Sequence, residues 1–410
     1  MRIILIINGE IKKNTTPSSF QSLNPGDYEV VINMSGWQTW HKIITVKPSR
    51  ATFTGVVHLW PTPQVGERIT TNPAVNVTSS PDRSKILYYS KSGLSSGIWL
   101  LNLANGETNI IARPSLTDIL SLEWTNSGKE FLITQKSLGG NNFQIFNLSE
   151  RQWGNLNFPT NFSPSIIHFN EDENIIYAYS QNELYQFNRR THSLKLVWRE
   201  KLNDFRYHDG LIFGLVPNES GGINLKILNL SNLQLVPMED SLVLSTSLAF
   251  LESKGDWLPL FDQDRHTLYL LHSPLTELEP IRRLPEITKI DWASDGKSIL
   301  LTNNFEMWQY NIPDNKLNLL LRVSTPLTQA RFLNNEPYLI YTSGTKVWGL
   351  ELDTRGEQQN WLLADYPSAV EDIFIDPLSK SVNVKLPDGF WRINLKPNLS
   401  QSDEPLINWP

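Results

Sequence analysis

Short runs of alternating apolar and polar residues fill the first 60 residues. Within Asp27–Asn33, apolar side chains recur at every second position, which places them on one face of a strand. The runs Trp37–Val46 and Ala51–Leu59 alternate in the same way and are rich in strand-forming residues. An Asn-Gly dipeptide, typical of hairpin turns, follows the apolar run Ile3–Ile7, and this predicts a strand over residues 2–7. The pattern predicts a small all-β sandwich over residues 1–61.

A second pattern extends from residue 67 to about residue 397. An aromatic residue is followed three positions later by a polar residue, as in Trp99 and Asn102. We call this polar residue the anchor. Two of the eight units carry Gln144 and Lys226 in the aromatic position. The anchors recur at intervals of 39–45 residues: Asn102, Asn147, Asn188, Asn229, His272, Asn311, Glu351 and Asn394.

A turn cluster precedes each anchor by roughly 20 residues and separates two apolar runs. Each unit is therefore predicted to contain four strands. A turn separates the first and second strands, a loop separates the second and third, and the anchor turn separates the third and fourth. Four strands in roughly 42 residues make one blade of a β-propeller. Eight anchors predict eight blades, and seven is the alternative if one unit folds elsewhere. The turn clusters are residues 80–82, 126–128, 171–173, 208–210, 253–255, 294–296, 334–336 and 377–379.

The anchor is expected to have a structural role. Asn tolerates the left-handed conformation, and its side chain can accept a hydrogen bond from the backbone two residues on. That geometry suits the turn from the third strand to the fourth. The preceding aromatic residue is expected to pack between blades.

The two ends of the repeat predict how it closes. Residues 67–70 are followed by a short loop and a first strand, in the same arrangement as a fourth strand such as Asn109–Arg113. The last unit ends at Asn394–Pro397 without a fourth strand. We predict that residues 67–70 pair beside Phe390–Leu395, because this removes an open sheet edge. Occupation of that edge by Leu406–Trp409 would contradict the prediction.

Several N-terminal segments resemble, in the right order, the motifs of a PEGA domain, although the four-letter motif behind the family name is absent. The resemblance covers nearly all of residues 3–60. It implies a small non-catalytic β module of the bacterial envelope, located downstream of an anchor or signal sequence. The segments are Ile7–Glu10, Thr16-Pro17, Leu23–Val30, Gly36-Trp37, Trp40 and Val46–Pro48.

The blade at Ser80–Tyr88 resembles TolB-like and WD40-like propeller repeats, and the other blades match in outline. A PEGA-like module followed directly by a propeller is similar to a class of bacterial envelope proteins. The predicted organisation is a sandwich over 1–61, a linker over 62–66, a propeller over 67–397 and a C-terminal tail over 398–410.

Charge and cysteine content narrow the function. The chain has 410 residues, no cysteine and a formal charge of −6 without a basic block. Disulfides, thiol nucleophiles and cysteine-based zinc sites are excluded, and nucleic acid is disfavoured as a partner. Residues 1–61 carry six basic and three acidic side chains, a net +3, and the remainder carries −9. A basic module could face an anionic membrane or wall polymer, but for three net charges a chance scatter of charged residues is the simpler interpretation.

The apolar run at the N-terminus spans only Ile3–Ile7. A secretory signal needs roughly 7–15 apolar residues, and a membrane span needs about 18. We therefore expect a membrane anchor or a secretory signal upstream of Met1.

A metal site and a hydrolase motif can each be weighed against a simpler interpretation. The best metal-ligand cluster, around Asp262, Asp264, Arg265, His266 and His272, falls in one predicted hairpin and fits a charged turn. The stretch Gly93–Gly97 has the letters of a nucleophile elbow. That motif requires a strand-to-helix turn, whereas here it joins two predicted strands.

Carboxylates near the starts of inner strands are candidates for glycan cleavage. These are Asp118, Asp204, Glu371 and Asp372. Two carboxylates within about 10 Å of one another would support this alternative. Acidic residues at such positions more often form a solvated rim, so we predict no catalytic, cofactor or metal site.

The sequence therefore predicts a non-catalytic, extracytoplasmic binding scaffold of the bacterial cell envelope. A propeller face would bind a protein or a cell-wall polysaccharide. We expect a monomer without cofactors that contacts the membrane only through an upstream anchor. A propeller hydrolase acting on glycans is the alternative.

Overall fold

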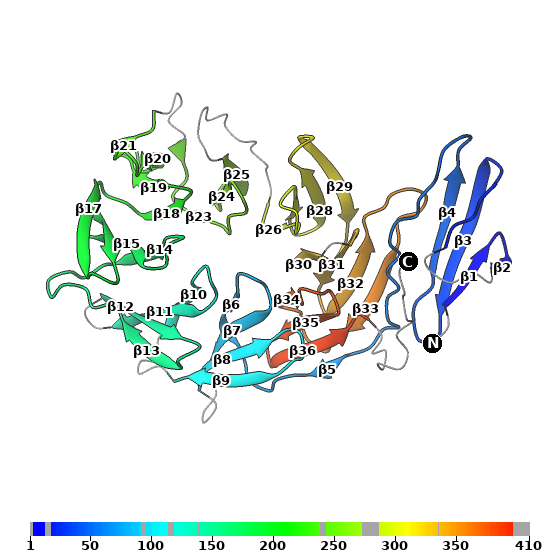
Figure 1. The fold of residues 1–410 in the computed structure, drawn as a ribbon, viewed down its shortest axis with the longest axis horizontal. Coiled ribbons are helices and arrows are strands. Elements are labelled where there is room, and N and C mark those ends of the chain that lie inside the picture. Colours follow the sequence, from blue (N-terminus) through cyan, green and yellow to red (C-terminus); the bar gives the residue numbers. More distant parts are fainter. Residues whose placement is uncertain are drawn as a thin grey trace, which may run out of the picture. The chain divides into compact units, whose positions relative to one another are not determined.

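The computed structural model describes residues 3–12, 18–91, 96–113, 119–137, 140–237, 243–272, 287–334 and 336–396. Within these ranges the extended elements are β-strands, arranged in nine sheets (Figure 1). The described residues contain no helix long and apolar enough to cross a membrane. The predicted all-β class is confirmed.

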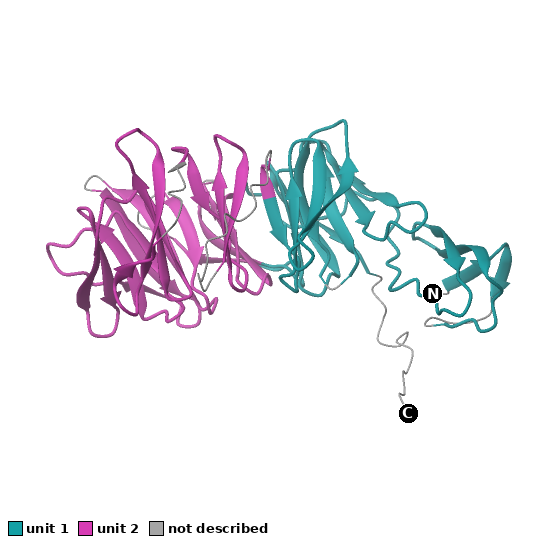
Figure 2. Cartoon of the chain, turned by 90° about the horizontal axis from the view of Figure 1, so that it is seen from above, with its two compact units in different colours: residues 1–73, 102–108, 290–410 teal, residues 74–101, 109–289 magenta. Residues whose placement is uncertain are grey.

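Two compact units divide the chain (Figure 2). Unit 1 comprises residues 1–73, 102–108 and 290–410, and unit 2 comprises residues 74–101 and 109–289. The N-terminal sheet belongs to unit 1. Its strands are β1 (Ile3–Ile7), β2 (Glu10–Lys12), β3 (Gly26–Met34) and β4 (Trp40–Val46), in the order β2-β1-β3-β4.

Unit 2 contributes five sheets. The first two are β6 (Val75–Ser79), β7 (Lys85–Ser90), β8 (Gly97–Asn102), β9 (Thr108–Ala112), and β10 (Ile119–Trp124), β11 (Glu130–Ser137), β12 (Gly140–Asn147), β13 (Gln152–Asn155). The next two are β14 (Ile166–Phe169), β15 (Ile175–Ser180), β16 (Glu183–Asn188), β17 (Ser193–Arg199), and β18 (Asp204–His208), β19 (Leu211–Pro217), β20 (Ile223–Asn229), β21 (Gln234–Leu235), with β22 (Val243–Leu244) also on β20. The fifth has three described strands, β23 (Leu248–Phe250), β24 (Trp257–Asp262) and β25 (Thr267–His272).

Unit 1 contributes three further sheets. They are β26 (Lys289–Trp292), β27 (Ser298–Thr302), β28 (Glu306–Asn311), β29 (Lys316–Arg322); β30 (Leu327–Phe332), β31 (Tyr338–Ser343), β32 (Lys346–Glu351), β33 (Asn360–Asp365); and β34 (Asp372–Ile375), β35 (Ser381–Leu386), β36 (Gly389–Asn394), β5 (Glu67–Arg68). The first two are antiparallel meanders of consecutive strands, whereas in the third the antiparallel fourth strand is β5, from the opposite end of the repeat. Nine sheets in all indicate about eight or nine blades and disfavour the alternative of seven.

The anchors confirm the frame of the repeat. All eight are the last residues of third strands, from Asn102 in β8 to Asn394 in β36. The predicted local hydrogen bond is present at four of them. Asn102 accepts the backbone N–H of residue 104 at 2.9 Å, and the anchors at 147, 188 and 229 accept the corresponding N–H at 2.9–3.0 Å.

The closing strand is also confirmed. β5 pairs antiparallel with β36 through Arg68 opposite Trp391 and Glu67 opposite Arg392. The backbone N–H of Ile69 extends the pairing by donating to the Phe390 carbonyl at 2.8 Å. The competing segment, Leu406–Trp409, lies outside the described residues.

The N-terminal region forms one four-stranded sheet rather than the two facing sheets of the predicted sandwich. The strand expected at Ala51–Leu59 is wrong, since no ladder is formed there and the chain makes a single bridge, Trp37 to Pro61, just beyond it. This segment packs through side chains instead. The Trp60 ring lies so close to Gly349 that a Cβ at that glycine would come within 2.7 Å of it. The motif Thr16-Pro17 lies outside the described residues.

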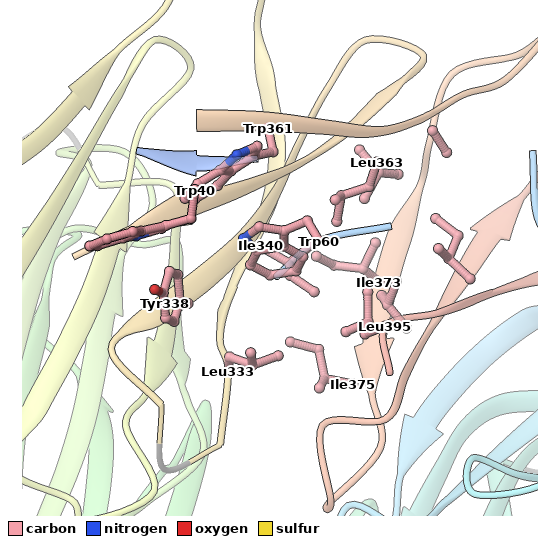
Figure 3. Close-up of a cluster of buried hydrophobic side chains, with 14 of the residues drawn as sticks. Trp40, Trp60, Leu333, Tyr338, Ile340, Trp361, Leu363, Ile373, Ile375 and Leu395 are labelled. Atoms are coloured by element: carbon pink, nitrogen blue, oxygen red, sulfur yellow. The ribbon is translucent and has the colours of Figure 1, made fainter. Parts of the chain in front are cut away.

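A continuous apolar cluster joins the N-terminal sheet to the blade β30–β33 (Figure 3). Trp40 and Trp60 are almost fully buried in it, next to Tyr338 and Trp361. Burial at roughly 25 cal/mol per Å² makes such large aromatic side chains the main source of attraction. The blade thus supplies the second layer that a lone sheet needs.

A buried ion pair lies at the same contact. Lys42 of β4 places its ammonium 2.8 Å from Glu351 Oε2 and 3.4 Å from Asp353 Oδ2, and its side chain has no exposed surface. Glu351 is the anchor of this blade, so the one acidic residue among the eight anchor positions contacts the N-terminal sheet. Nearby, His58 Nδ1 lies 2.6 Å from Glu336 Oε2.

Candidate functional site: charged clusters on the first strands

The first strands of three successive blades of unit 2 bring four charged or ionisable side chains together. His168 of β14 lies at the centre, with Nδ1 3.8 Å from Glu123 Oε1 of β10 and Nε2 3.5 Å from Asp204 Oδ1 of β18. The Arg206 guanidinium, also on β18, lies 3.3 Å from His168 Nδ1 and 3.8 Å from Glu123. Phe205 packs edge-on against the imidazole at 5.0 Å. First strands line the channel of a propeller, so this cluster is the candidate site.

The protonation states follow from these contacts. Burial, the largest influence, and Arg206 both oppose protonation of His168, yet its polar contacts with Asp204 and Glu123 raise its pKa overall. Burial would raise the pKa of both carboxyl groups, but hydrogen bonding to His168 and attraction to His168 and Arg206 lower it. Each of these shifts is in the direction that favours the ionised form of its group.

Unit 1 repeats this arrangement on its own first strands. Arg331 of β30 reaches Asp291 of β26 at 3.2 Å and Asp372 of β34 at 3.7 Å. Asp291 is buried and also accepts the backbone N–H of Phe332 at 2.9 Å. In both units a cation stands between carboxylates of neighbouring strands. Such pairing compensates for the cost of removing the charges from water.

The predicted carboxylates have different surroundings. Asp204 and Asp372 belong to these clusters, whereas Glu371 is exposed and forms an ion pair with Lys385 on the adjacent strand. Asp118 lies outside the described residues. Glu123 and Asp204 contact opposite nitrogens of one imidazole ring, so they meet the spacing of about 10 Å that glycoside hydrolysis allows.

The chemistry of hydrolysis has a second requirement that this cluster does not meet. A glycosidase needs one carboxyl group with a raised pKa, to protonate the leaving oxygen. The pKa of Glu123 and that of Asp204 are both lowered, and the His168 imidazole lies between them. The cluster is arranged to hold charge rather than to transfer a proton.

The histidine-containing hairpin joins β24 to β25, and its first carboxylate is enclosed rather than exposed as an exposed charged turn would require. Asp262 is fully buried and accepts hydrogen bonds from Ser245 and from the backbone of Arg265. His272 instead packs on Trp257, with ring centroids 4.5 Å apart. Gly97, at the end of the elbow-like string, opens the strand β8 and not a helix. Residues 93–95 of that string lie outside the described part.

Sequence reasoning missed five of the cluster members, although a signal was present. Each stands directly before an aromatic residue near the end of a first strand, just ahead of a turn cluster. In a strand the two neighbours point to opposite sides, so the aromatic side chain enters the blade interface while the charged one lies on the other side. The pairs are Glu123-Trp124, His168-Phe169, Arg206-Tyr207, Asp291-Trp292 and Arg331-Phe332.

Comparison with known proteins supports the fold alone. No family model and no curated protein sequence matches the chain. Among solved structures, one described as the eukaryotic initiation factor aligns with a TM-score of 0.51 and 11% identity, covering 87% of this chain and 94% of that one. The Dos1 propeller aligns with a TM-score of 0.50 and 11% identity, covering 82% and 95%. The chain therefore has a WD40-like β-propeller fold.

Proposed function

We propose that this protein is a non-catalytic binding scaffold whose propeller binds a protein partner. One observation carries the proposal: the described carboxylates of the first-strand clusters are ion-paired with cations from the same or neighbouring strands. Groups held in this way keep their charge and are poor at proton transfer. Propellers present loops on a rigid scaffold, and such loops are where binding residues concentrate.

We further propose an extracytoplasmic position in the bacterial cell envelope. The PEGA-like motifs and the net charge of +3 over residues 1–61 support this location. The N-terminal sheet would face the membrane or wall, and the propeller would carry the recognition surface. A cell-wall polysaccharide is the alternative ligand, and the chain would act as a monomer.

Two experiments test these proposals on the full chain. Fractionation of cells that carry the intact gene should recover the product in the envelope, and recovery in the cytosol would contradict the location. Affinity capture from envelope extracts should recover a defined protein partner. Loss of that partner after competition with wall polysaccharide would instead favour the alternative ligand.

The hydrolase alternative has its own test. Incubation with wall glycans should give no turnover. Turnover that Asp204→Asn abolishes, while Glu371→Gln leaves it intact, would establish the alternative. Glu371 is a suitable control because its carboxylate is exposed and lies outside the cluster.

A further inference from the structure

A pocket of about 540 Å³ lies where the blade β14–β17 meets the blade β18–β22 in unit 2. This volume is in the range of sites that take up a small molecule or one large side chain, roughly 300–1,000 Å³. Tyr177 of β15 and Tyr207 of β18 line it, together with the turn at Asp209-Gly210 and the apolar side chain of Leu211. The pocket is separate from the charged clusters described above.

Tyr177 has a hydroxyl group without a hydrogen-bond partner among the described residues. The residue is 2% exposed, and its ring stacks on Tyr207 with centroids 5.4 Å apart and planes 14° apart. Two positions along the same strand, the Tyr179 hydroxyl contacts Asn182 at 3.2 Å and accepts the backbone N–H of Leu202 at 2.8 Å. A buried hydroxyl is normally satisfied in that way. Tyr177 lines the pocket and its hydroxyl is not one of the fully enclosed unpartnered atoms, so a ligand in the pocket can reach it.

The electrostatic surroundings select the charge of that ligand. Asp209 lines the pocket, and Glu171 lies close by. Burial raises the pKa of Tyr207, the Gly210 backbone N–H opposes that rise, and both carboxylates add to it. A negative potential of this kind repels phosphate and acidic peptides and attracts cations.

We infer that this pocket receives a basic side chain, arginine or lysine, from a protein partner. The cation donates a hydrogen bond to Tyr177 Oη, lies against Tyr207 and is attracted by the carboxylate of Asp209 at the pocket lining. The negative face of an aromatic ring attracts a nearby cation, and the hydroxyl oxygen accepts a hydrogen bond that orients the cation. The inference rests on the proposed function, since it supplies one contact of the bound protein.

The test titrates the full chain with Nα-acetyl-arginine methylamide and with the corresponding lysine compound, followed by NMR. The uncharged citrulline analogue has the shape of the arginine compound without its charge. We expect saturable binding of at least one basic compound, and about tenfold weaker binding of citrulline, the factor expected when a hydrogen bond to a charged group is lost. The stronger of the two basic compounds identifies the side chain.

Matched variants locate the binding. Tyr177→Phe should weaken it about tenfold by removing only the hydroxyl. Tyr366→Phe is the control, because Tyr366 is also buried with an unpartnered hydroxyl but lies in unit 1, outside the pocket. Both variants should melt like the unmodified chain.

Three results would overturn the inference: no saturable binding of either basic compound, equal binding of citrulline, or unchanged affinity in Tyr177→Phe. If affinity capture recovered a protein partner although one of these three results was obtained, the inference about the pocket would fail and the scaffold proposal would remain supported. Binding of the basic compounds without any captured partner would contradict only the scaffold proposal.

Discussion

At the scale of single residues, buried charges are balanced by named partners. Lys42 has no exposed side-chain surface and lies against Glu351, Asp353 and the Asp353 carbonyl. Burial would raise the pKa of Asp353, but hydrogen bonds from Arg355 and attraction to Lys42 lower it to about 2. Removal of the ammonium would therefore leave two carboxylates facing one another at an apolar contact.

Lys42→Met should lower the free energy of unfolding by about 3–5 kcal/mol, because an unpaired buried charge remains. Denaturant unfolding measures the change. Adding Glu351→Gln should recover part of the loss. Lys346→Met serves as the control, since its pair with Asp365 is half exposed and should contribute no more than about 1 kcal/mol. Equal effects of the two lysine substitutions would contradict the importance of burial.

The cluster around His168 should make stability depend on pH. The raised pKa of His168 means that its contribution is complete below the unfolded value, about 6.5, and is lost as pH rises through the folded value. The lowered pKa values of Glu123 and Asp204 mean that their contribution is present above about pH 4.3 and is lost as pH falls through the folded values.

The melting temperature should therefore fall on the alkaline side of about pH 6.5, and His168→Gln should flatten that part of the profile. Thermal unfolding between pH 4 and 9 measures it. An identical slope in wild type and variant would show that His168 does not titrate as its contacts require. His192→Gln is the control, because His192 lies in an exposed turn between β16 and β17.

At the scale of elements, one short strand completes a sheet. β5 covers the edge of β36, and Gly66 leads into it with φ +80°. A Cβ at Gly66 would come within 2.3 Å of the Arg392 carbonyl oxygen. The chain can therefore reach the edge only with glycine at this position.

Gly66→Ala should detach β5 and lower the melting temperature markedly. Gly221→Ala is the matched control, because Gly221 has φ +83° but no atom within 4 Å of the added Cβ. Both variants bear the strain of a positive φ, about 1–2 kcal/mol, so the difference between them reports the lost pairing. Scanning calorimetry measures it. Equal losses would mean that β5 contributes little.

At the scale of the whole molecule, the N-terminal sheet is part of a larger unit. Its apolar face and Lys42 meet the blade β30–β33, and Gln38, between β3 and β4, donates a hydrogen bond to the Leu362 carbonyl at 2.8 Å. Residues 1–61 therefore contribute buried contacts to unit 1.

Deletion of residues 1–61 should expose the apolar surface around Tyr338 and Trp361 and leave Glu351 unpaired. We expect the truncated chain to aggregate and to bind a hydrophobic dye, because apolar patches of this kind drive association. Size-exclusion chromatography compares it with the 47.0 kDa full chain. A monomeric fragment with an unchanged melting temperature would show that the contact is dispensable.

The sequence alone determined the features that depend on neighbours along the chain. Strand periodicity, the anchor turns and the closing strand could be predicted because alternation, a hydrogen bond across two residues and a copied frame are local or repetitive signals. The tertiary structure alone decided which distant residues meet. Lys42 finds Glu351, His168 finds Glu123 and Asp204, and Tyr177 stacks on Tyr207. These pairings depend on how one sheet packs against the next, and no local pattern encodes a packing distance.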